Sequence, residues 1–157
     1  MTNNIKLQEV CKQLHIPVVG TTSWPLPIEA REILQESNPC PFTAADIDER
    51  LIGTTDFMPH SAIVCLFPYH MPHEGPTNLS RYTWATDYHL VVTDYLQRLV
   101  DELKTTAPDA SFSIHCDTSP LADRYMAYLA GLGFYGKNKC FINPTWGSYI
   151  VIGTVLT

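Results

Sequence analysis

Hydrophobic and polar positions follow two different periods along this chain, which predicts a mixture of helices and strands. Apolar residues recur at helical spacing over residues 4–15, 28–35 and 86–106. The segment 61–68, SAIVCLFP, is a continuous apolar run next to prolines, and it predicts a strand buried inside a sheet. Further strands are predicted at 18–19, 111–116, 139–142 and 148–155.

Local signals predict where several helices begin and end. Thr43-Ala-Ala-Asp46 resembles a capping box, so a short helix should run to about Leu51. Ser119-Pro120 should open another helix, because Ser caps helices and Pro is tolerated at the first position. Glycines 131 and 133 should end it. The inner face of the helix over 86–106 should carry Tyr88, Val91, Val92, Tyr95, Leu99 and Leu103. The inner face of the helix after Ser119-Pro120 should carry Leu121, Tyr125, Tyr128 and Leu129.

The predicted strands are joined by helices of varied length, without a regular alternation of strand and helix. We therefore expect an α+β fold with a single mixed sheet flanked by helices. A length of 157 residues fits one domain, residues 1–157. Within it we expect an N-terminal helical part over 1–40 and a core over 41–157.

Charge and cysteine usage exclude several classes of protein. The net charge of −6 argues against non-specific nucleic-acid binding by this segment alone, which needs clustered Lys and Arg. No signal peptide and no membrane-spanning run is present, so we expect a cytoplasmic protein without a membrane partner. The five cysteines are odd in number and form no C-x-x-C motif, which is typical of a reducing compartment and mostly buried thiols.

A loop of about 16 residues, 69–84, contains aromatic and basic side chains, and loops of that length are often functional. His60, His70 and His73 lie in or near it. They supply no full set of zinc ligands at the usual spacing, so we expect no metal site. A metal-dependent hydrolase built on these histidines is the least favoured alternative.

Asp117 is the first candidate for chemistry. It ends a predicted strand and precedes a helix cap, where site residues often lie. Apolar neighbours would favour its protonated form and make it a proton donor. Alternatively, Asp117 caps the turn with its own side chain. The adjacent Cys116 could be a nucleophile, although its place in the strand pattern favours a structural thiol.

The run G-L-G-F-Y-G-K-N over 131–138 matches no nucleotide-binding fingerprint, because its glycines end a helix rather than open one. It predicts a helix stop followed by tight backbone that a flat ligand can approach closely. Lys137, Asn138 and Asn143 could then donate or accept hydrogen bonds to an amide-rich ligand.

Several motifs in order resemble those of a known family. They are D-T-S-P over 117–120, A-G-L-G-F-Y-G-K-N over 130–138, I-N-P-T-W-G-S over 142–148 and S-R-Y-T-W-A-T-D-Y-H over 80–89. Together they are similar to the N-terminal half of epoxyqueuosine reductases, over residues from about 40 to 157. Each motif alone is weak, but the ordered set is specific.

The resemblance implies a fold similar to cobalamin-processing and nitroreductase-like domains. It also implies a cobalamin-dependent reductase that converts epoxyqueuosine to queuosine in tRNA, with residues 41–157 as the cobalamin-binding core. Asp117 would donate a proton to the departing epoxide oxygen. The residues implied in cobalamin binding are Arg81, Tyr82, Tyr88, His89, Gly136, Lys137, Asn138, Phe141 and Asn143.

The family continues into a domain with two ferredoxin-type cysteine sets that hold [4Fe–4S] clusters. No such set lies within these 157 residues. Electrons would therefore come from that domain or from an electron-donor protein, and tRNA would bind only to the complete enzyme. A shortened chain, a split gene and a degenerate relative are all compatible with this. The alternative is a non-catalytic module that binds a corrinoid or a partner.

Overall fold

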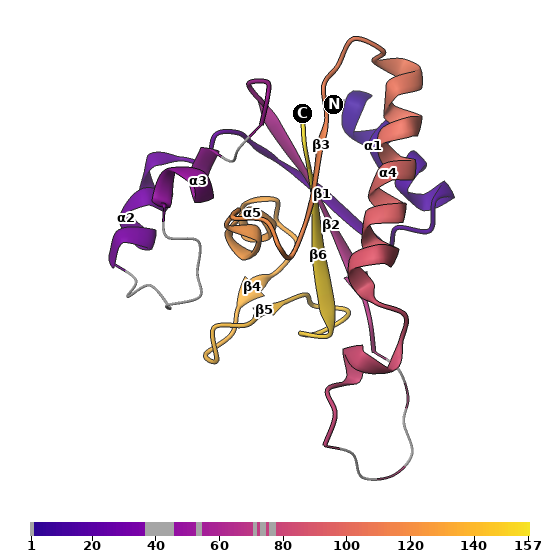
Figure 1. Ribbon diagram of the computed structural model, residues 1–157, viewed down its shortest axis with the longest axis vertical. Coiled ribbons are helices and arrows are strands. Elements are labelled where there is room, and N and C mark those ends of the chain that lie inside the picture. Colours follow the sequence, from indigo (N-terminus) through magenta and orange to yellow (C-terminus); the bar gives the residue numbers. More distant parts are fainter. Residues whose placement is uncertain (1, 37–45, 53–54, 71, 73–74, 76–77) are drawn as a thin grey trace.

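The computed structural model describes residues 2–36, 46–52, 55–70, 72, 75 and 78–157. A twisted sheet forms the middle layer, with α1 and α4 on one face and α2, α3 and α5 on the other (Figure 1). In chain order the elements are α1 (Thr2–Gln13), β1 (Val18–Ser23), α2 (Ile28–Glu36), α3 (Ile47–Ile52), β2 (Ser61–Pro68), the 3-10 helix η1 (Arg81–Trp84), α4 (Tyr88–Thr106), β3 (Ser113–Cys116), α5 (Asp123–Leu129), β4 (Phe134–Tyr135), β5 (Phe141–Ile142) and β6 (Ile150–Leu156).

The main sheet has four strands in the order β1-β2-β6-β3, and the α+β class is confirmed. Each hydrogen-bonded pair of strands in it is antiparallel, so the expectation of a mixed sheet is wrong. The reason is the path of the chain. Helix α4 returns the chain so that β2 and β3 run in the same direction, but β6 inserts between them and runs against both. A separate two-stranded hairpin, β4-β5, lies outside this sheet.

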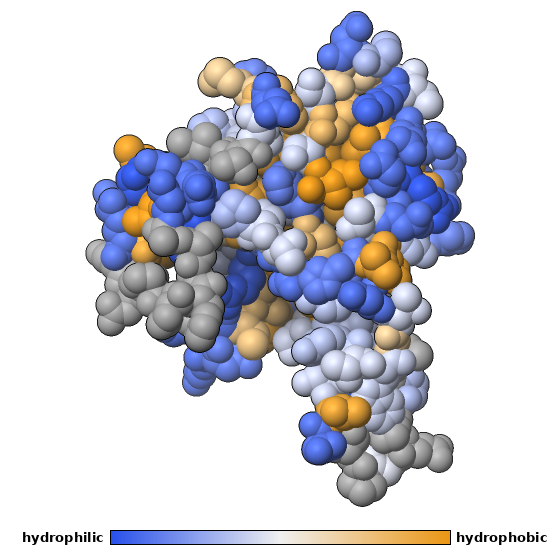
Figure 2. Space-filling view, viewed as in Figure 1, coloured by the Kyte–Doolittle hydropathy of each residue, from blue (hydrophilic) through white to orange (hydrophobic). Residues whose placement is uncertain are grey.

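Strand β2 is central, as its continuous apolar run predicts. Its alternate side chains enter two different cores, because both faces of the sheet are covered. Ala62, Val64 and Leu66 pack with α2, α3 and α5, whereas Ile63 and Cys65 pack with α1 and α4. Polar residues cover much of the outer surface near α4 and around α2 and α3, and hydrophobic residues are visible between them (Figure 2).

Helix α4 begins at Tyr88, two residues later than the predicted start at residue 86. Asp87 is its N-cap, and the Asp87 side chain accepts a hydrogen bond from the backbone N–H of His89. This satisfies one of the free donors at the helix start. The predicted inner stripe is only partly right: Val91 is 37% exposed. The residues that α4 buries are Val92, Leu96, Leu99 and Val100.

The two short helices begin later than predicted. Helix α3 follows Asp46, whose carboxylate accepts a hydrogen bond from the Asp48 N–H, while residues 43–45 of the expected capping box lie outside the described residues. Helix α5 begins at Asp123 rather than near Ser119, whose hydroxyl instead accepts from the Leu121 N–H in a turn. The core side of α5 is formed by Met126 and Ala127.

A tight hairpin follows α5. Gly131 ends the helix with φ of +72°, a conformation that glycine adopts without strain. The strand expected at 139–142 is shorter, because β5 contains only Phe141 and Ile142, which pair with β4. Gly133 lies against the carbonyl of Ile142, so closely that a Cβ atom there would be 2.2 Å from the carbonyl oxygen.

The thiols are less uniformly buried than expected. Cys11 and Cys65 are buried, Cys116 is half-buried and Cys140 is exposed, while Cys40 lies outside the described residues. In the part of the chain that the structure describes, we find no helix with the length and apolar character needed to cross a bilayer.

Candidate active site

An open cavity of about 1140 Å³ lies where α2, α5, the β4-β5 hairpin and the start of α4 approach one another. Its walls are rich in aromatic rings. Six tyrosines from five separate parts of the chain line it, namely Tyr69, Tyr82, Tyr88, Tyr125, Tyr128 and Tyr135. Asp117 is part of the same wall. The cavity therefore combines a large aromatic surface with a carboxylic acid.

The backbone holds Asp117 in an unusual conformation. Its φ is +54°, a region in which Asp and Asn are enriched among non-glycine residues. The N–H of Thr118 donates to the carbonyl oxygen of Cys116 over 2.6 Å, which closes a γ-turn around Asp117. A γ-turn with positive φ is the rarer and more strained form, and such strain collects at functional sites. The turn directs the Asp117 side chain away from the strand that precedes it.

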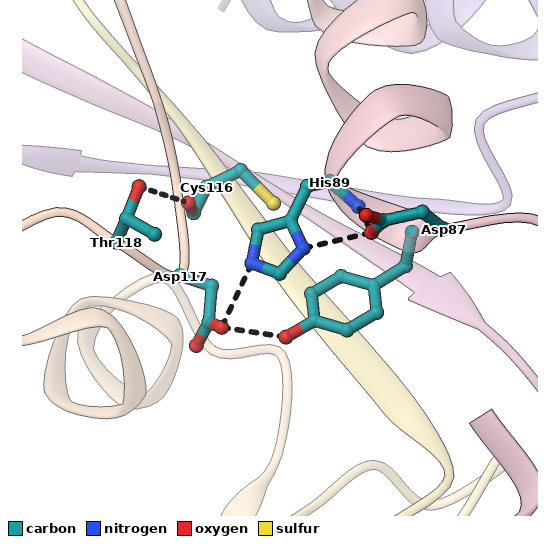
Figure 3. A network of polar contacts seen from close by, with 6 residues as sticks. Asp87, His89, Cys116, Asp117 and Thr118 are labelled. Carbon is teal, nitrogen blue, oxygen red and sulfur yellow. Dashed lines mark hydrogen bonds and ion pairs between the residues drawn. The ribbon is translucent and has the colours of Figure 1, made fainter. Parts of the chain in front are cut away.

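The Asp117 carboxylate accepts two hydrogen bonds, both at Oδ2. The Tyr88 hydroxyl donates to it over 2.5 Å, and the distance from His89 Nε2 is 3.1 Å (Figure 3). Both donors come from the first turn of α4. The Asp117 side chain is 57% exposed, so it does not lie in the apolar environment expected from the sequence. Its hydrogen-bonded donors, rather than apolar burial, define its surroundings.

The His89 ring lies between two carboxylates. Its Nδ1 atom lies 2.8 Å from Asp87 Oδ1, while Nε2 faces Asp117. The pKa of His89 is raised, first by the hydrogen bond to Asp87 and also by the hydrogen bond to Asp117, with burial opposing both. The pKa of Asp87 is lowered, chiefly by the backbone and side-chain hydrogen bonds from His89. These directions favour a charged imidazolium between two carboxylates.

Tyr88 is a hydrogen-bond donor that keeps its proton. Burial, and then the hydrogen bond to Asp117, raise the pKa of the Tyr88 hydroxyl well above its ordinary value. The Tyr88 ring also stacks on the His89 ring, with centroids 4.1 Å apart. This stacking fixes both donors relative to the Asp117 carboxylate.

A second carboxyl group lines the cavity at Asp123, the first residue of α5. Burial raises the pKa of Asp123 to about 7, with a further contribution from the Asp117 charge, while Arg124 lowers it. Two acids with different surroundings therefore share one wall, an arrangement often found where one group carries a proton and the other a charge.

Cys116 is a poor candidate for a nucleophile. Burial raises the pKa of its thiol to about 11, and the charges of Asp117, Asp123 and Asp87 act in the same direction. The reactive form of cysteine is the thiolate, which is scarce at neutral pH under these conditions. The geometry thus favours the structural thiol.

Three of the residues expected to bind a cofactor, Tyr82, Tyr88 and Gly136, line the cavity with Asp117. The His89 ring instead contacts Asp87, Tyr88 and Asp117. Arg81 lies 2.9 Å from His70 Nε2 and over the ring of Tyr149. None of the described lining of the cavity comes from Arg81 or His89.

The other expected ligand residues have contacts within the chain. Asn143 is 6% exposed, and its amide donates to the Leu132 carbonyl and accepts from the N–H groups of Thr145 and Trp146. Phe141 is 4% exposed in the core. The exposed Asn138 accepts from the Cys140 N–H within the hairpin turn. Lys137 is exposed on the same turn and is not part of the described cavity lining, so the roles of these four residues in binding stay predictions.

Several lining residues were not singled out from the sequence. Tyr125 and Tyr128 both line the cavity from α5; Tyr125 also packs against the core, as predicted, whereas Tyr128 is 49% exposed. Lys139, two positions after Lys137, is the lysine that lines the cavity, and Arg124 donates to its carbonyl over 2.8 Å. The signal available in the sequence was the density of tyrosines after Asp117, because a purely apolar core has little use for so many hydroxyl groups.

The histidines of the long loop are not assembled into a metal site by the described residues, which contain no group of three metal-ligating side chains. His60 and His70 flank the eight-residue strand β2, whose ends are roughly 26 Å apart at the usual rise per residue. The two cannot share one ion. His73 lies outside the described residues.

Comparisons with known proteins show which family this chain resembles. Residues 57–118 match the family model described as "Epoxyqueuosine reductase QueG, DUF1730". An epoxyqueuosine reductase of Synechococcus sp. (strain CC9605) is 41% identical over 86 residues, which are 55% of this chain and 27% of that protein.

Solved structures extend the similarity to nearly the whole chain. The structure of epoxyqueuosine reductase from Streptococcus thermophilus has a TM-score of 0.83 at 23% identity, and the match covers 99% of this chain and 46% of that one. An epoxyqueuosine reductase with an epoxyqueuosine-modified tRNA-Tyr stem loop has a TM-score of 0.76 at 26% identity, covering 99% and 45%.

A Bacillus subtilis epoxyqueuosine reductase, described with a catalytic aspartate loop swung out of the active site, has a TM-score of 0.75 at 25% identity. That match covers 99% of this chain and 45% of the Bacillus chain. The chain is therefore related in sequence and fold to the epoxyqueuosine reductases, and it spans less than half of the length of the relatives named above.

Proposed function

We propose that this chain is the cobalamin-binding half of an epoxyqueuosine-reductase-type enzyme, with Asp117 as its proton donor. The observation that carries the proposal is the position of Asp117 in the wall of a large aromatic cavity, hydrogen-bonded to Tyr88 and His89. The relationship to reductases of this kind, one of which is described with a catalytic aspartate loop, supports the same reading.

The residues of the cavity fit a corrinoid. Pockets for drug-sized ligands measure about 300–1,000 Å³, and a volume of about 1140 Å³ leaves room for a larger group. Tyrosine rings offer flat apolar surface with a hydroxyl at the end, which suits a macrocycle fringed with amides. Arg124 and Lys139 add hydrogen-bond donors at the hairpin side of the wall. The residues that would hold the group are therefore Tyr69, Tyr82, Tyr125, Tyr128, Tyr135, Gly136 and Lys139.

Asp117 then acts at the reacting oxygen. A bound cobalamin supplies electrons through its cobalt. The protein supplies the proton: Asp117 gives it to the oxygen that leaves the epoxide carbon, and the carboxylate that remains is stabilised by the Tyr88 hydroxyl at Oδ2. Oδ1 has no hydrogen-bond partner among the described residues, so it is available to a substrate in the cavity. General-acid catalysis of this type typically contributes about 10²–10⁴-fold in rate.

The partners follow from the same assignment. Reduction of an epoxide to an alkene consumes two electrons, which we assign to [4Fe–4S] clusters of a further domain or of a donor protein. The substrate is epoxyqueuosine in tRNA, as in the relative whose structure contains a modified tRNA stem loop. A tRNA-modifying reductase of this kind is expected in the cytoplasm.

A non-catalytic module is the second candidate. Ferredoxin-type cysteine sets are not found in these 157 residues, so this chain would need an outside source of electrons for any reduction. In that case the cavity would hold a corrinoid or a partner without redox chemistry, and Asp117 would serve only to shape the turn.

The substitution Asp117→Asn separates the two candidates. Asn tolerates positive φ as Asp does, so the γ-turn should survive. The chain, together with the iron–sulfur domain or donor protein assigned above, is supplied with cob(II)alamin, a low-potential chemical reductant and an epoxyqueuosine-containing stem loop, and queuosine is measured. We expect turnover to fall by about 10²-fold or more while cobalamin binding is unchanged.

The matched control is Asp109→Asn, an exposed carboxylate in the turn before β3, which should leave turnover unaffected. Full turnover by D117N would contradict the proton-donor role. Cobalamin binding by the wild-type chain without any turnover would favour the non-catalytic module.

A further inference from the structure

We propose that His89 and Asp87 form a proton reserve for Asp117, which holds a second proton beside the site and reloads Asp117 from outside the cavity. The inference rests on the proposed function, because it assigns the proton source of the same reaction. It changes the role of His89 from a residue facing a cofactor to a residue that acts through Asp117.

The geometry places the imidazole between two carboxylates. Asp87 Oδ1 lies 2.8 Å from Nδ1, and Asp117 Oδ2 lies 3.1 Å from Nε2 (Figure 3). The backbone N–H of His89 also donates to Asp87 Oδ1 over 2.9 Å. Asp87 Oδ1 therefore contacts His89 at two atoms, the backbone N–H and the ring Nδ1. One ring nitrogen is held by Asp87, and the other is directed at the proposed proton donor.

The other groups that face His89 leave this pairing intact. Tyr88 stacks on the imidazole and remains neutral, since its own pKa is raised. The thiol of Cys116, next to Asp117 in sequence, also remains neutral, because its pKa is about 11. Asp87 is the first charged neighbour that raises the pKa of His89, and Asp117 adds to this whenever its carboxyl group has lost its proton.

His89 and Asp87 can exchange protons with solvent outside the described lining of the cavity. Asp117 and Tyr88 line the cavity, whereas His89 is not part of its described lining. The His89 side chain is nevertheless 37% exposed and that of Asp87 is 58% exposed. A cofactor and substrate that fill the cavity would shield Asp117 from water on that side. His89 would still exchange protons with solvent from the other side.

The reaction class requires such a reserve. Conversion of an epoxide to an alkene consumes two electrons and two protons and releases the oxygen as water. Asp117 carries one proton at a time. When Asp117 has given its proton to the departing oxygen, the Nε2 proton of His89 moves to Asp117 Oδ2. This leaves a neutral imidazole whose Nδ1–H still donates to Asp87, and the ring regains a proton from solvent.

Nitrogen-detected NMR of the 157-residue chain tests the reserve without turnover. The pKa and tautomer of His89 are read from its ring ¹⁵N shifts during a pH titration. We expect a midpoint above the ordinary value of about 6.5, so that the imidazolium fraction at pH 7 exceeds that of an unperturbed histidine. His115, half-buried and hydrogen-bonded to Ser113, provides an internal contrast, because burial lowers its pKa and it should be neutral at that pH.

Asp87→Asn is the decisive variant. It removes the charge that holds Nδ1 but keeps a side chain able to cap α4, so the His89 midpoint should fall while the fold and cob(II)alamin binding stay unchanged. In the turnover assay, the alkaline limit of the pH profile should move down with the His89 midpoint. His89→Gln keeps a donor toward Asp117 but carries no titratable proton, and it should lower turnover roughly 10-fold or more at pH values below the wild-type His89 midpoint, where the wild-type ring holds the reserve proton.

Two results would overturn the reserve: a His89 midpoint at or below the ordinary value, or a pH profile that is the same in wild type and D87N. Failure of the proposed function has a different signature. A chain that binds no cob(II)alamin, with His89 charged as expected, would contradict the cobalamin assignment and leave the hydrogen-bonded network as observed.

Discussion

Asp117 obtains its surroundings from backbone geometry and from residues distant in sequence. The γ-turn turns the side chain toward α4, where Tyr88 and His89 contact it across 29 and 28 positions of sequence. Asp123 approaches the same cavity wall from the opposite side of the turn, on α5. The cavity thus contains one carboxylate with two donors and one carboxyl group whose pKa is raised to about 7.

Asp123 should make stability depend on pH. Its folded pKa of about 7 lies above the unfolded value of about 3.9, so the folded state holds a proton that the unfolded state has lost between these values. The free energy of unfolding contributed by this group therefore decreases as pH rises from 4 to 7. We expect Asp123→Asn to gain roughly 2 kcal/mol relative to wild type between pH 4.5 and pH 7.5.

Urea unfolding at both pH values measures this difference. Asp109→Asn, in an exposed turn, is the control and should show no such change. A D123N stability difference from wild type that is the same at pH 4.5 and pH 7.5 would contradict the buried, protonated carboxyl group.

At the residue scale, the sequence predicted the position of Asp117 but not the nature of its environment. The end of a strand before a turn is recognisable from the local pattern, whereas the donors from α4 depend on tertiary packing. Asn143 shows a structural role that its motif did not reveal. Its three hydrogen bonds to Leu132, Thr145 and Trp146 all stay within the chain, while its role in binding stays a prediction.

At the scale of elements, the long or strongly apolar segments were predictable and the short ones were not. The period of α4 and the apolar run of β2 are long enough to determine the element from sequence. The Ser119 hydroxyl accepts a hydrogen bond from the Leu121 N–H in a turn. The capping residue predicted for α5 therefore stabilises this turn, and the helix begins later. The β4-β5 hairpin depends on the close approach of Gly133 to the Ile142 carbonyl.

The hairpin should be sensitive to one methyl group. In Gly133→Ala the new Cβ would lie 2.2 Å from the Ile142 carbonyl oxygen and 2.8 Å from the Phe141 ring, so the backbone must move. We expect a loss of about 3 kcal/mol in the free energy of unfolding, at the upper end for overpacking. Gly131→Ala is the matched comparison, because it has open space and only its φ of +72° opposes a side chain.

That comparison variant should lose about 1 kcal/mol. Chemical denaturation of both variants gives the two values. Equal losses for G133A and G131A would show that the hairpin is not held by the contact between Gly133 and Ile142.

At the scale of the whole molecule, the antiparallel sheet separates two cores and leaves the cavity on one side of it. Helices α1 and α4 close the first core, while α2, α3 and α5 close the second and border the cavity. Strand order could not be read from the sequence, because β6, the last strand in the chain, lies between β2 and β3. The aromatic cavity likewise brings together tyrosines that are up to 66 positions apart, from Tyr69 to Tyr135.

Binding of cob(II)alamin to the purified 157-residue chain decides whether the cavity holds a corrinoid. We expect a shift of the visible spectrum that saturates at one equivalent, with binding heat in calorimetry. Replacement of both Tyr128 and Tyr135, which line the cavity and are 49% and 43% exposed, by serine should weaken this binding at least 10-fold without unfolding the chain. No spectral shift and no binding heat at millimolar cobalamin, with a folded chain, would contradict the claim that this cavity holds a corrinoid.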